Sequence, residues 1–130
     1  MKKISLVFGF LLITVVSAFA QNGIVKNVSS EEFKKLMNEN KKAEIIDLRT
    51  TDEIKAKGKI KGAKQIDFLA VDAEKKISAL DKNKTYLVYC AGGGRSGDAA
   101  ELMHKQGFKE VVNLEKGFGE WLKKGFEIEK

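Results

Sequence analysis

Short apolar runs alternate with stretches of helical periodicity along this chain, and this alternation restricts its fold more than any other feature. The runs have the length of strands, and most are rich in β-branched and aromatic residues. Between them, apolar residues recur three and four positions apart, as they do on one face of a helix. The expected strands are 24–28, 44–48, 64–68, 86–90 and 110–114.

The helices are expected in the intervals between these strands. Ser29 with Glu32 and Thr50 with Glu53 have the spacing of a capping box, in which an N-cap hydroxyl and a glutamate satisfy each other's backbone N–H groups. Strands that alternate with helices indicate an α/β fold, with a central parallel five-stranded sheet and helices on both faces. Helices are expected to begin after Ser29 and Thr50, the second ending near Gly58, and to cover 71–80, 96–105 and 117–124.

The first residues have the pattern of a secretory signal. Lys2 and Lys3 precede a mostly apolar run, which ends in Ala18, Phe19 and Ala20. The run is short compared with the roughly 20 residues of a membrane-spanning helix, so no stable membrane anchor is expected after cleavage. We expect residues 1–20 to be a cleaved signal peptide, residues 21–130 to form one domain, and the mature protein to be periplasmic.

Charge restricts the class of partner. The chain has 24 Lys and Arg residues against 18 Asp and Glu residues, a formal net charge of +6. The lysines are scattered through the expected helices with acidic residues among them, which is typical of a solvated surface. Nucleic-acid-binding proteins instead cluster basic residues on one face. We therefore expect no nucleic-acid partner, and a mild attraction to small anions.

Cys90 is the only cysteine and is the last residue of the expected strand 86–90. An unpaired thiol in an exported protein is either a small buried hydrophobic group or a reactive one. Functional groups of parallel α/β sheets gather at the carboxyl ends of strands, where a helix begins. The position of Cys90 therefore favours a reactive thiol.

The loop after Cys90 favours ionisation of that thiol. Ala91 is followed by Gly92, Gly93 and Gly94, and so small a loop can turn its backbone N–H groups inward. The start of the next helix adds its partial positive charge at the same place. Arg95 is positioned to supply a cation, or to hold an anionic substrate. We expect a nucleophile that is active near neutral pH without a histidine base.

Two other interpretations of this loop fit less well. Gly92, Gly94 and Gly97 spell the G-x-G-x-x-G pattern of dinucleotide sites, with Glu115 at a suitable distance for a ribose contact, but only one clear strand follows. Cysteine phosphatases have one more residue between cysteine and arginine than the four between Cys90 and Arg95. The shorter ring of N–H groups is expected to close too tightly around a phosphate, but to surround a single sulfur atom on the cysteine.

The Cys-x4-Arg spacing, between a strand and a helix, resembles the rhodanese (sulfurtransferase) family. Asp47-Leu48-Arg49 and the segment 58–63 are similar to the family's Asp-x-Arg and Gly-His-Ile-Pro-Gly-Ala motifs, and residues 114–121 are similar to its closing Leu-x-Gly-Gly-x-x-x-Trp motif. The three segments occur in the family's order over nearly the whole expected domain. The departures are Lys59, Lys61 and Lys116 within these motifs, and Ala91 where many active members have an arginine.

This resemblance implies a two-step transfer without a metal or organic cofactor. The thiolate of Cys90, the expected catalytic residue, would take a sulfane sulfur from thiosulfate or a persulfide and become a persulfide itself. Cyanide or a thiol would then accept the sulfur. Asp47 and Arg49 are expected to support the site. The residues expected to bind the small anionic donor are Ala91, Gly92, Gly93, Gly94, Arg95 and Ser96.

The alternative to an enzyme is a binding module. The loop could hold an anion, or present a persulfide to a partner, without turnover. Ala91 keeps this alternative open, because the missing arginine leaves one cation fewer for thiosulfate. A cysteine phosphatase is the less favoured third alternative, because of the loop length.

Overall fold

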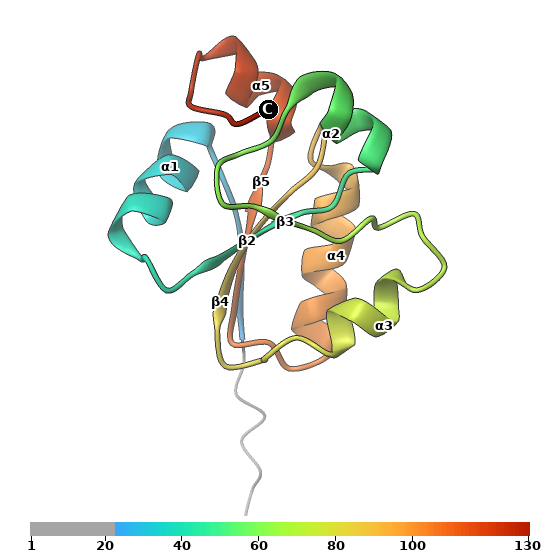
Figure 1. Ribbon diagram of the computed structural model, residues 1–130. Coiled ribbons are helices and arrows are strands. Elements are labelled where there is room, and N and C mark those ends of the chain that lie inside the picture. The colour runs from blue at the N-terminus through green and yellow to red at the C-terminus, as the bar shows by residue number, and fades with distance from the viewer. Residues whose placement is uncertain (1–22) are drawn as a thin grey trace, which may run out of the picture.

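A computed structural model describes residues 23–130, so the signal peptide expected at residues 1–20 lies outside the described residues. All the strands of its five-stranded sheet are parallel, which confirms the expected fold class (Figure 1). The strand order is β1-β5-β4-β2-β3. The strands are β1 (Ile24–Val28), β2 (Glu44–Asp47), β3 (Lys64–Gln65), β4 (Thr85–Tyr89) and β5 (Glu110–Leu114).

Helices cover both faces of this sheet, as expected (Figure 1). Phe33 and Trp121, from two helices on one face, pack in one core cluster with Leu87 of β4. On the other face, Ile77 and Met103 pack in a second cluster. The helices are α1 (Ser30–Glu39), α2 (Thr51–Lys57), α3 (Ala73–Ser78), α4 (Gly94–Lys105) and α5 (Gly117–Lys123). Helices α1 and α5 belong to the first face, and α3 and α4 to the second.

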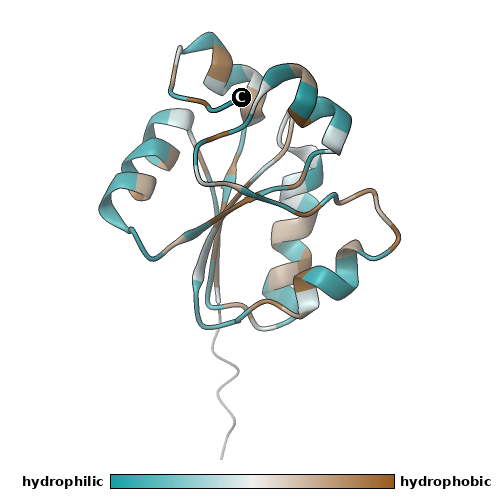
Figure 2. Cartoon of the chain, viewed as in Figure 1, coloured by the Kyte–Doolittle hydropathy of each residue, from teal (hydrophilic) through white to brown (hydrophobic). Residues whose placement is uncertain are grey.

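The central strand β4 is apolar along its whole length because both of its faces are buried. Tyr86 and Val88 lie in the cluster with α3 and α4, whereas Leu87 and Tyr89 lie in the cluster with α1 and α5. Figure 2 shows hydrophobic residues along the central strands and hydrophilic residues over much of the helices. Cys90 follows β4 directly and belongs to the cluster with α4.

One of the two expected capping boxes is complete, and the other is half formed. Thr50 Oγ1 accepts a hydrogen bond from the Glu53 N–H at 3.3 Å, and Glu53 Oε1 accepts one from the Thr50 N–H at 3.2 Å, which completes the expected capping box. At the start of α1 only half of the expected box forms: Ser29 Oγ accepts from the Glu32 N–H at 3.2 Å, without the return bond from the Ser29 N–H to the Glu32 side chain. Helix α2 therefore begins where its sequence predicts, near the carboxyl ends of the strands.

Some elements differ in length from expectation. The strand expected at 64–68 is regular only over Lys64–Gln65, because its partner β2 ends at Asp47. Beyond that point, only the single bonds from the Ile66 N–H to the Asp47 oxygen and from the Phe68 N–H to the Leu48 oxygen continue the pairing. Helix α3 is shorter than 71–80, and α4 begins at Gly94 rather than at residue 96. Within residues 23–130, no helix combines the length and apolar character that crossing a membrane requires.

Candidate active site

The loop that joins β4 to α4 turns tightly because Gly93 has a left-handed backbone. Its φ is +100°, and it is the N-cap residue of α4. A Cβ atom on Gly93 would lie 1.9 Å from the carbonyl oxygen of Glu115, so a side chain there would force the backbone to move. This glycine lets the loop curl back over the end of β4.

Three hydrogen-bond donors converge on the sulfur of Cys90. The Gly93 N–H donates to Sγ at 3.1 Å, the Ser96 hydroxyl at 3.3 Å and the Ser96 N–H at 3.5 Å. The Cys90 residue is 1% exposed, and burial by itself raises the pKa of the thiol. The Ser96 hydroxyl and the N–H groups of Ser96, Gly93 and Gly92 outweigh this effect, so the pKa of Cys90 is lowered. The structure thus brings together Cys90, Gly92, Gly93 and Ser96, as the sequence predicts.

Arg95 lies near this loop but is engaged by a carboxylate. Its Nη1 donates to Glu53 Oε1 at 2.7 Å, and its Nη2 donates to Glu53 Oε2 at 2.9 Å. The hydrogen bond from Arg95 is the main reason that the pKa of Glu53 falls to about 2. The largest contributions to the lowered pKa of Cys90 come from hydroxyl and N–H donors rather than from this guanidinium. The sequence assigns Glu53 only to a helix cap and misses its pairing with Arg95.

Asp47 and Arg49 form a buried ion pair at the carboxyl end of β2. Arg49 Nε donates to Asp47 Oδ1 at 3.0 Å, and Arg49 Nη2 donates to Asp47 Oδ2 at 2.7 Å. Arg49 Nη2 also donates to the Gly58 oxygen at 2.8 Å. The Tyr89 hydroxyl donates to Asp47 Oδ2 at 2.6 Å and accepts from the Ile60 N–H at 3.0 Å. These bonds join β2, β4 and the end of α2.

One buried residue that contacts the loop after Cys90 escapes sequence reasoning. Asn113 lies in β5 and is 3% exposed. Its Nδ2 donates to Asn27 Oδ1 at 2.9 Å, and to the Gly93 oxygen in the Cys90 loop at 3.5 Å. The only indication in the sequence is an amide within the otherwise apolar run Val111 to Leu114.

A cavity of about 350 Å³ meets the loop at Ala91. Ala91, Gly92 and Gly94 are exposed, in contrast to the buried Cys90. The cavity lies between α2 and the start of α5, at the carboxyl ends of the strands, and Cys90 itself is not part of its wall. Its lining residues are Arg49, Asp52, Glu53, Ala56, Lys57, Ala91, Phe118 and Gly119.

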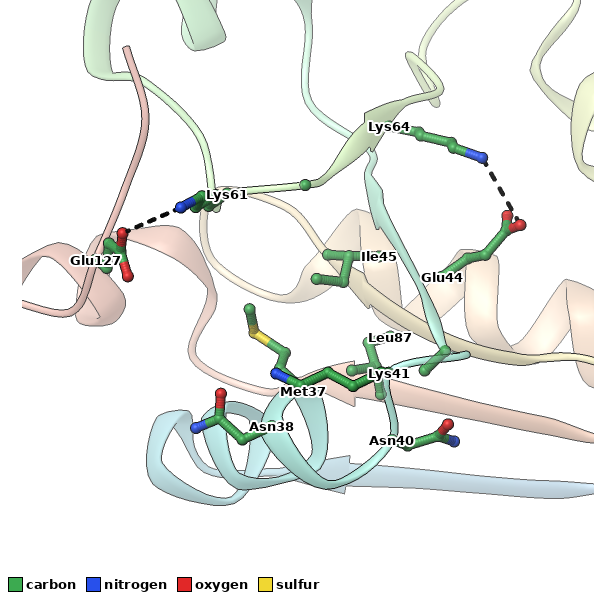
Figure 3. Close-up of a pocket in the computed structure, with 12 residues that line it drawn as sticks. Met37, Asn38, Asn40, Lys41, Glu44, Ile45, Lys61, Lys64, Leu87 and Glu127 are labelled. Carbon is green, nitrogen blue, oxygen red and sulfur yellow. Dashed lines mark ion pairs between the residues drawn. The ribbon is translucent and has the colours of Figure 1, made fainter.

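A larger hollow of about 520 Å³ lies elsewhere (Figure 3). Glu44 and Lys64, the first residues of β2 and β3, form an ion pair at 3.7 Å on one side of it, and Lys61 pairs with Glu127 at 3.8 Å on another (Figure 3). Its lining includes no residue of the Cys90 loop. Because strands begin at one edge of a parallel sheet and end at the other, this hollow is at the opposite edge from Cys90.

The chain matches the family model described as "Rhodanese-like domain" over residues 29–124. A protein of Allochromatium vinosum described as a sulfurtransferase is 29% identical over 105 residues, which cover 81% of this chain and 95% of that protein.

Solved structures show the same fold. A rhodanese-like domain protein from Staphylococcus aureus is 33% identical, with a TM-score of 0.67, and the match covers 81% of this chain and 99% of that one. The polysulfide-sulfur transferase homodimer from Wolinella succinogenes is 31% identical, with a TM-score of 0.68, over 85% of this chain and 81% of that one. These matches confirm the fold that the sequence motifs imply.

Proposed function

Because the chain belongs to the rhodanese-like sulfurtransferase family, we propose that it transfers a sulfane sulfur through a persulfide on Cys90. The observation that carries this proposal is the convergence of the Gly93 N–H, the Ser96 N–H and the Ser96 hydroxyl on the single cysteine sulfur. These donors stabilise a thiolate, which is the nucleophilic form of cysteine. The similarity to a polysulfide-sulfur transferase gives further support.

In the first step, the Cys90 thiolate attacks the outer sulfur of the donor. A new S–S bond forms, and the donor's own S–S bond breaks. With thiosulfate the leaving group is sulfite, which departs with the bonding electrons, and with a persulfide it is a thiolate. The Gly93 and Ser96 hydrogen-bond donors stay beside Cys90 Sγ, the inner sulfur of the persulfide.

In the second step, cyanide or a thiolate attacks the outer sulfur of the Cys90 persulfide. The S–S bond breaks, and its electrons return to Cys90 Sγ. A thiol of low pKa leaves faster in such an exchange, so the same donors that make Cys90 a nucleophile also make it a leaving group. No metal or organic cofactor takes part in either step.

A module that carries a persulfide without turnover is the second candidate. Two observations favour it: Ala91 supplies no cation at the loop, and the guanidinium of Arg95 is occupied by Glu53. A module would release at most one sulfur atom per molecule when cyanide is added, whereas an enzyme would continue for as long as a donor is present.

The Cys90→Ser variant tests the assignment. Serine nearly matches cysteine in volume but reacts poorly with sulfur, so thiocyanate formation should cease while the fold is kept. Circular dichroism serves as the control for folding. A rate of thiocyanate formation near that of the wild type would refute the role of Cys90.

The place of the reaction is a separate proposal. The pattern of residues 1–20 supports export, with cleavage after Ala20 and a periplasmic mature domain. The protein recovered from a periplasmic extract should then begin at Gln21. A full-length chain confined to the cytoplasmic fraction would contradict export and leave the sulfur chemistry untouched.

A further inference from the structure

Positive and negative side chains around the cavity at Ala91 are equal in number. The guanidinium of Arg49 is bound by Asp47, and that of Arg95 is bound by Glu53. Asp52 and Lys57, both exposed residues of α2, contribute one charge of each sign to the lining. A ligand in this cavity therefore meets no excess of positive charge.

The rest of the wall is apolar or lacks a side chain. Ala56, Ala91, Phe118 and Gly119 line the cavity between the charged groups. The Arg49 guanidinium lies 4.0 Å from the centre of the Phe118 ring, so the face of this cation is covered. The volume of about 350 Å³ falls within the range of small-molecule sites, which are mostly apolar with a few polar groups.

A thiosulfate dianion suits such a wall poorly. Removing a doubly charged ion from water is unfavourable unless cations replace its hydration shell. Ala91 provides none, Arg95 already makes two hydrogen bonds to Glu53, and the charge of Lys57 in the lining is offset by that of Asp52. An uncharged organic group, in contrast, binds favourably because it removes the apolar surfaces of Ala56 and Phe118 from water.

We propose that this cavity binds the uncharged organic body of a low-molecular-weight persulfide, and that Glu53 disfavours dianionic donors by occupying Arg95. This substrate class rests on the proposed sulfur transfer through Cys90. Ala91 lines the cavity and directly follows Cys90 in the chain, so a body bound there lies beside the loop that holds the nucleophile.

The step balances as an exchange of one sulfur atom. The Cys90 thiolate attacks the outer sulfur of R–S–SH, and an S–S bond forms between Cys90 and that sulfur. The donor's S–S bond breaks, and the organic sulfur leaves as R–S⁻ with the bonding electrons. The products are Cys90–S–SH and the organic thiolate, and no oxidant or reductant is needed.

The experiment compares two donors in single-turnover loading of Cys90, followed by mass spectrometry. Benzyl persulfide has an uncharged apolar body, whereas thiosulfate has no organic body. Ala56→Phe fills the cavity from an exposed position of α2 and should slow loading by benzyl persulfide about tenfold, with little change for thiosulfate. Ala79→Phe, an exposed alanine at the end of α3 outside the lining, is the matched control and should change neither rate.

Glu53→Gln tests the second half of the proposal. The amide keeps the shape of the side chain and releases the charge of Arg95, so loading by thiosulfate should become about tenfold faster, the effect of one charged hydrogen bond. Ala56→Phe slowing both donors equally, or Glu53→Gln leaving thiosulfate loading unchanged, would overturn the proposal. Loading of Cys90 by neither donor in the wild type would instead contradict the proposed function itself.

Discussion

Two buried polar groups lie at the same edge of the sheet, and the protein satisfies them in opposite ways. The Arg49 cation, in a residue 1% exposed, is neutralised by the Asp47 carboxylate. The Cys90 sulfur, equally buried, accepts hydrogen bonds from the neutral donors of Gly93 and Ser96. One group has a counter-ion and the other has only hydrogen bonds.

This difference separates a structural role, for the Asp47–Arg49 ion pair, from a chemical role, for Cys90. The Arg49 ion pair is saturated by Asp47 and the Gly58 oxygen, so it joins strands and is not free to react. The Cys90 sulfur is held by hydrogen bonds and has no counter-ion, so no ion pair has to break before it can attack a sulfur donor. Variants of the Asp47–Arg49 pair should therefore change the free energy of unfolding. Variants of the donors around Cys90 should change the reactivity of its thiol.

The largest effect is expected from Asp47→Asn, which leaves the Arg49 cation buried without its counter-ion. Breaking a buried pair from one side costs about 3–5 kcal/mol, and urea unfolding should show this loss in the free energy of unfolding. Asp52→Asn removes an exposed carboxylate from the first turn of α2 and should cost less than about 1 kcal/mol. Similar losses of stability for the two variants would show that the buried ion pair contributes no more than an exposed carboxylate.

The next effect concerns the loop and pairs two neighbouring glycines. Gly93→Ala places a Cβ atom against the Glu115 oxygen in a left-handed conformation, so we expect a loss of about 2 kcal/mol or more and a higher pKa for Cys90. Gly94→Ala meets no atom within 4 Å and is expected to change little. Urea unfolding and the pH dependence of alkylation measure the two quantities. Equal behaviour of the two variants would show that the curled loop is not required.

Ser96→Ala should separate reactivity from stability. It removes the hydroxyl that donates to Cys90 Sγ and should raise the pKa of the thiol, because the thiolate loses one of its hydrogen bonds. The alkylation rate against pH gives the midpoint, which in the wild type should lie below the free-cysteine value of about 8.5. Ser78→Ala, at an exposed serine of α3, is the control. An unchanged midpoint in Ser96→Ala would show that this hydroxyl does not stabilise the thiolate.

The smallest effect on stability is expected from Glu53→Gln, because the Arg95–Glu53 pair is partly exposed and such pairs contribute about 0–1 kcal/mol. The pKa of Glu53 is lowered in the folded protein to about 2. Its contribution is therefore present above the unfolded value of about 4.3 and is lost as pH falls towards 2. Unfolding experiments on both proteins should show their difference in stability vanish over that range. A difference that grows on acidification would contradict this sign.

The sequence predicts the parts of this site that depend on neighbouring residues. The alternation of strands and helices predicts the parallel sheet, and the glycines after Cys90 predict a curled loop with inward N–H groups. The Arg95–Glu53 pair joins residues 42 positions apart, and only the packing of α2 beside the Cys90 loop brings them together. Asn113 contacts Gly93 for the same reason, since β5 lies beside β4 in the sheet. Contacts set by strand order cannot be deduced from local patterns.

The central claim is that Cys90 carries the transferred sulfur, and mass spectrometry of the intact protein tests it most directly. After treatment with thiosulfate or benzyl persulfide and removal of excess donor, we expect a mass increase of one sulfur atom. Fragmentation should place that sulfur on the peptide that contains Cys90. Cyanide should then remove it as thiocyanate, and Cys90→Ser should gain no mass. A wild-type protein whose Cys90 stays unmodified with both donors would contradict the account.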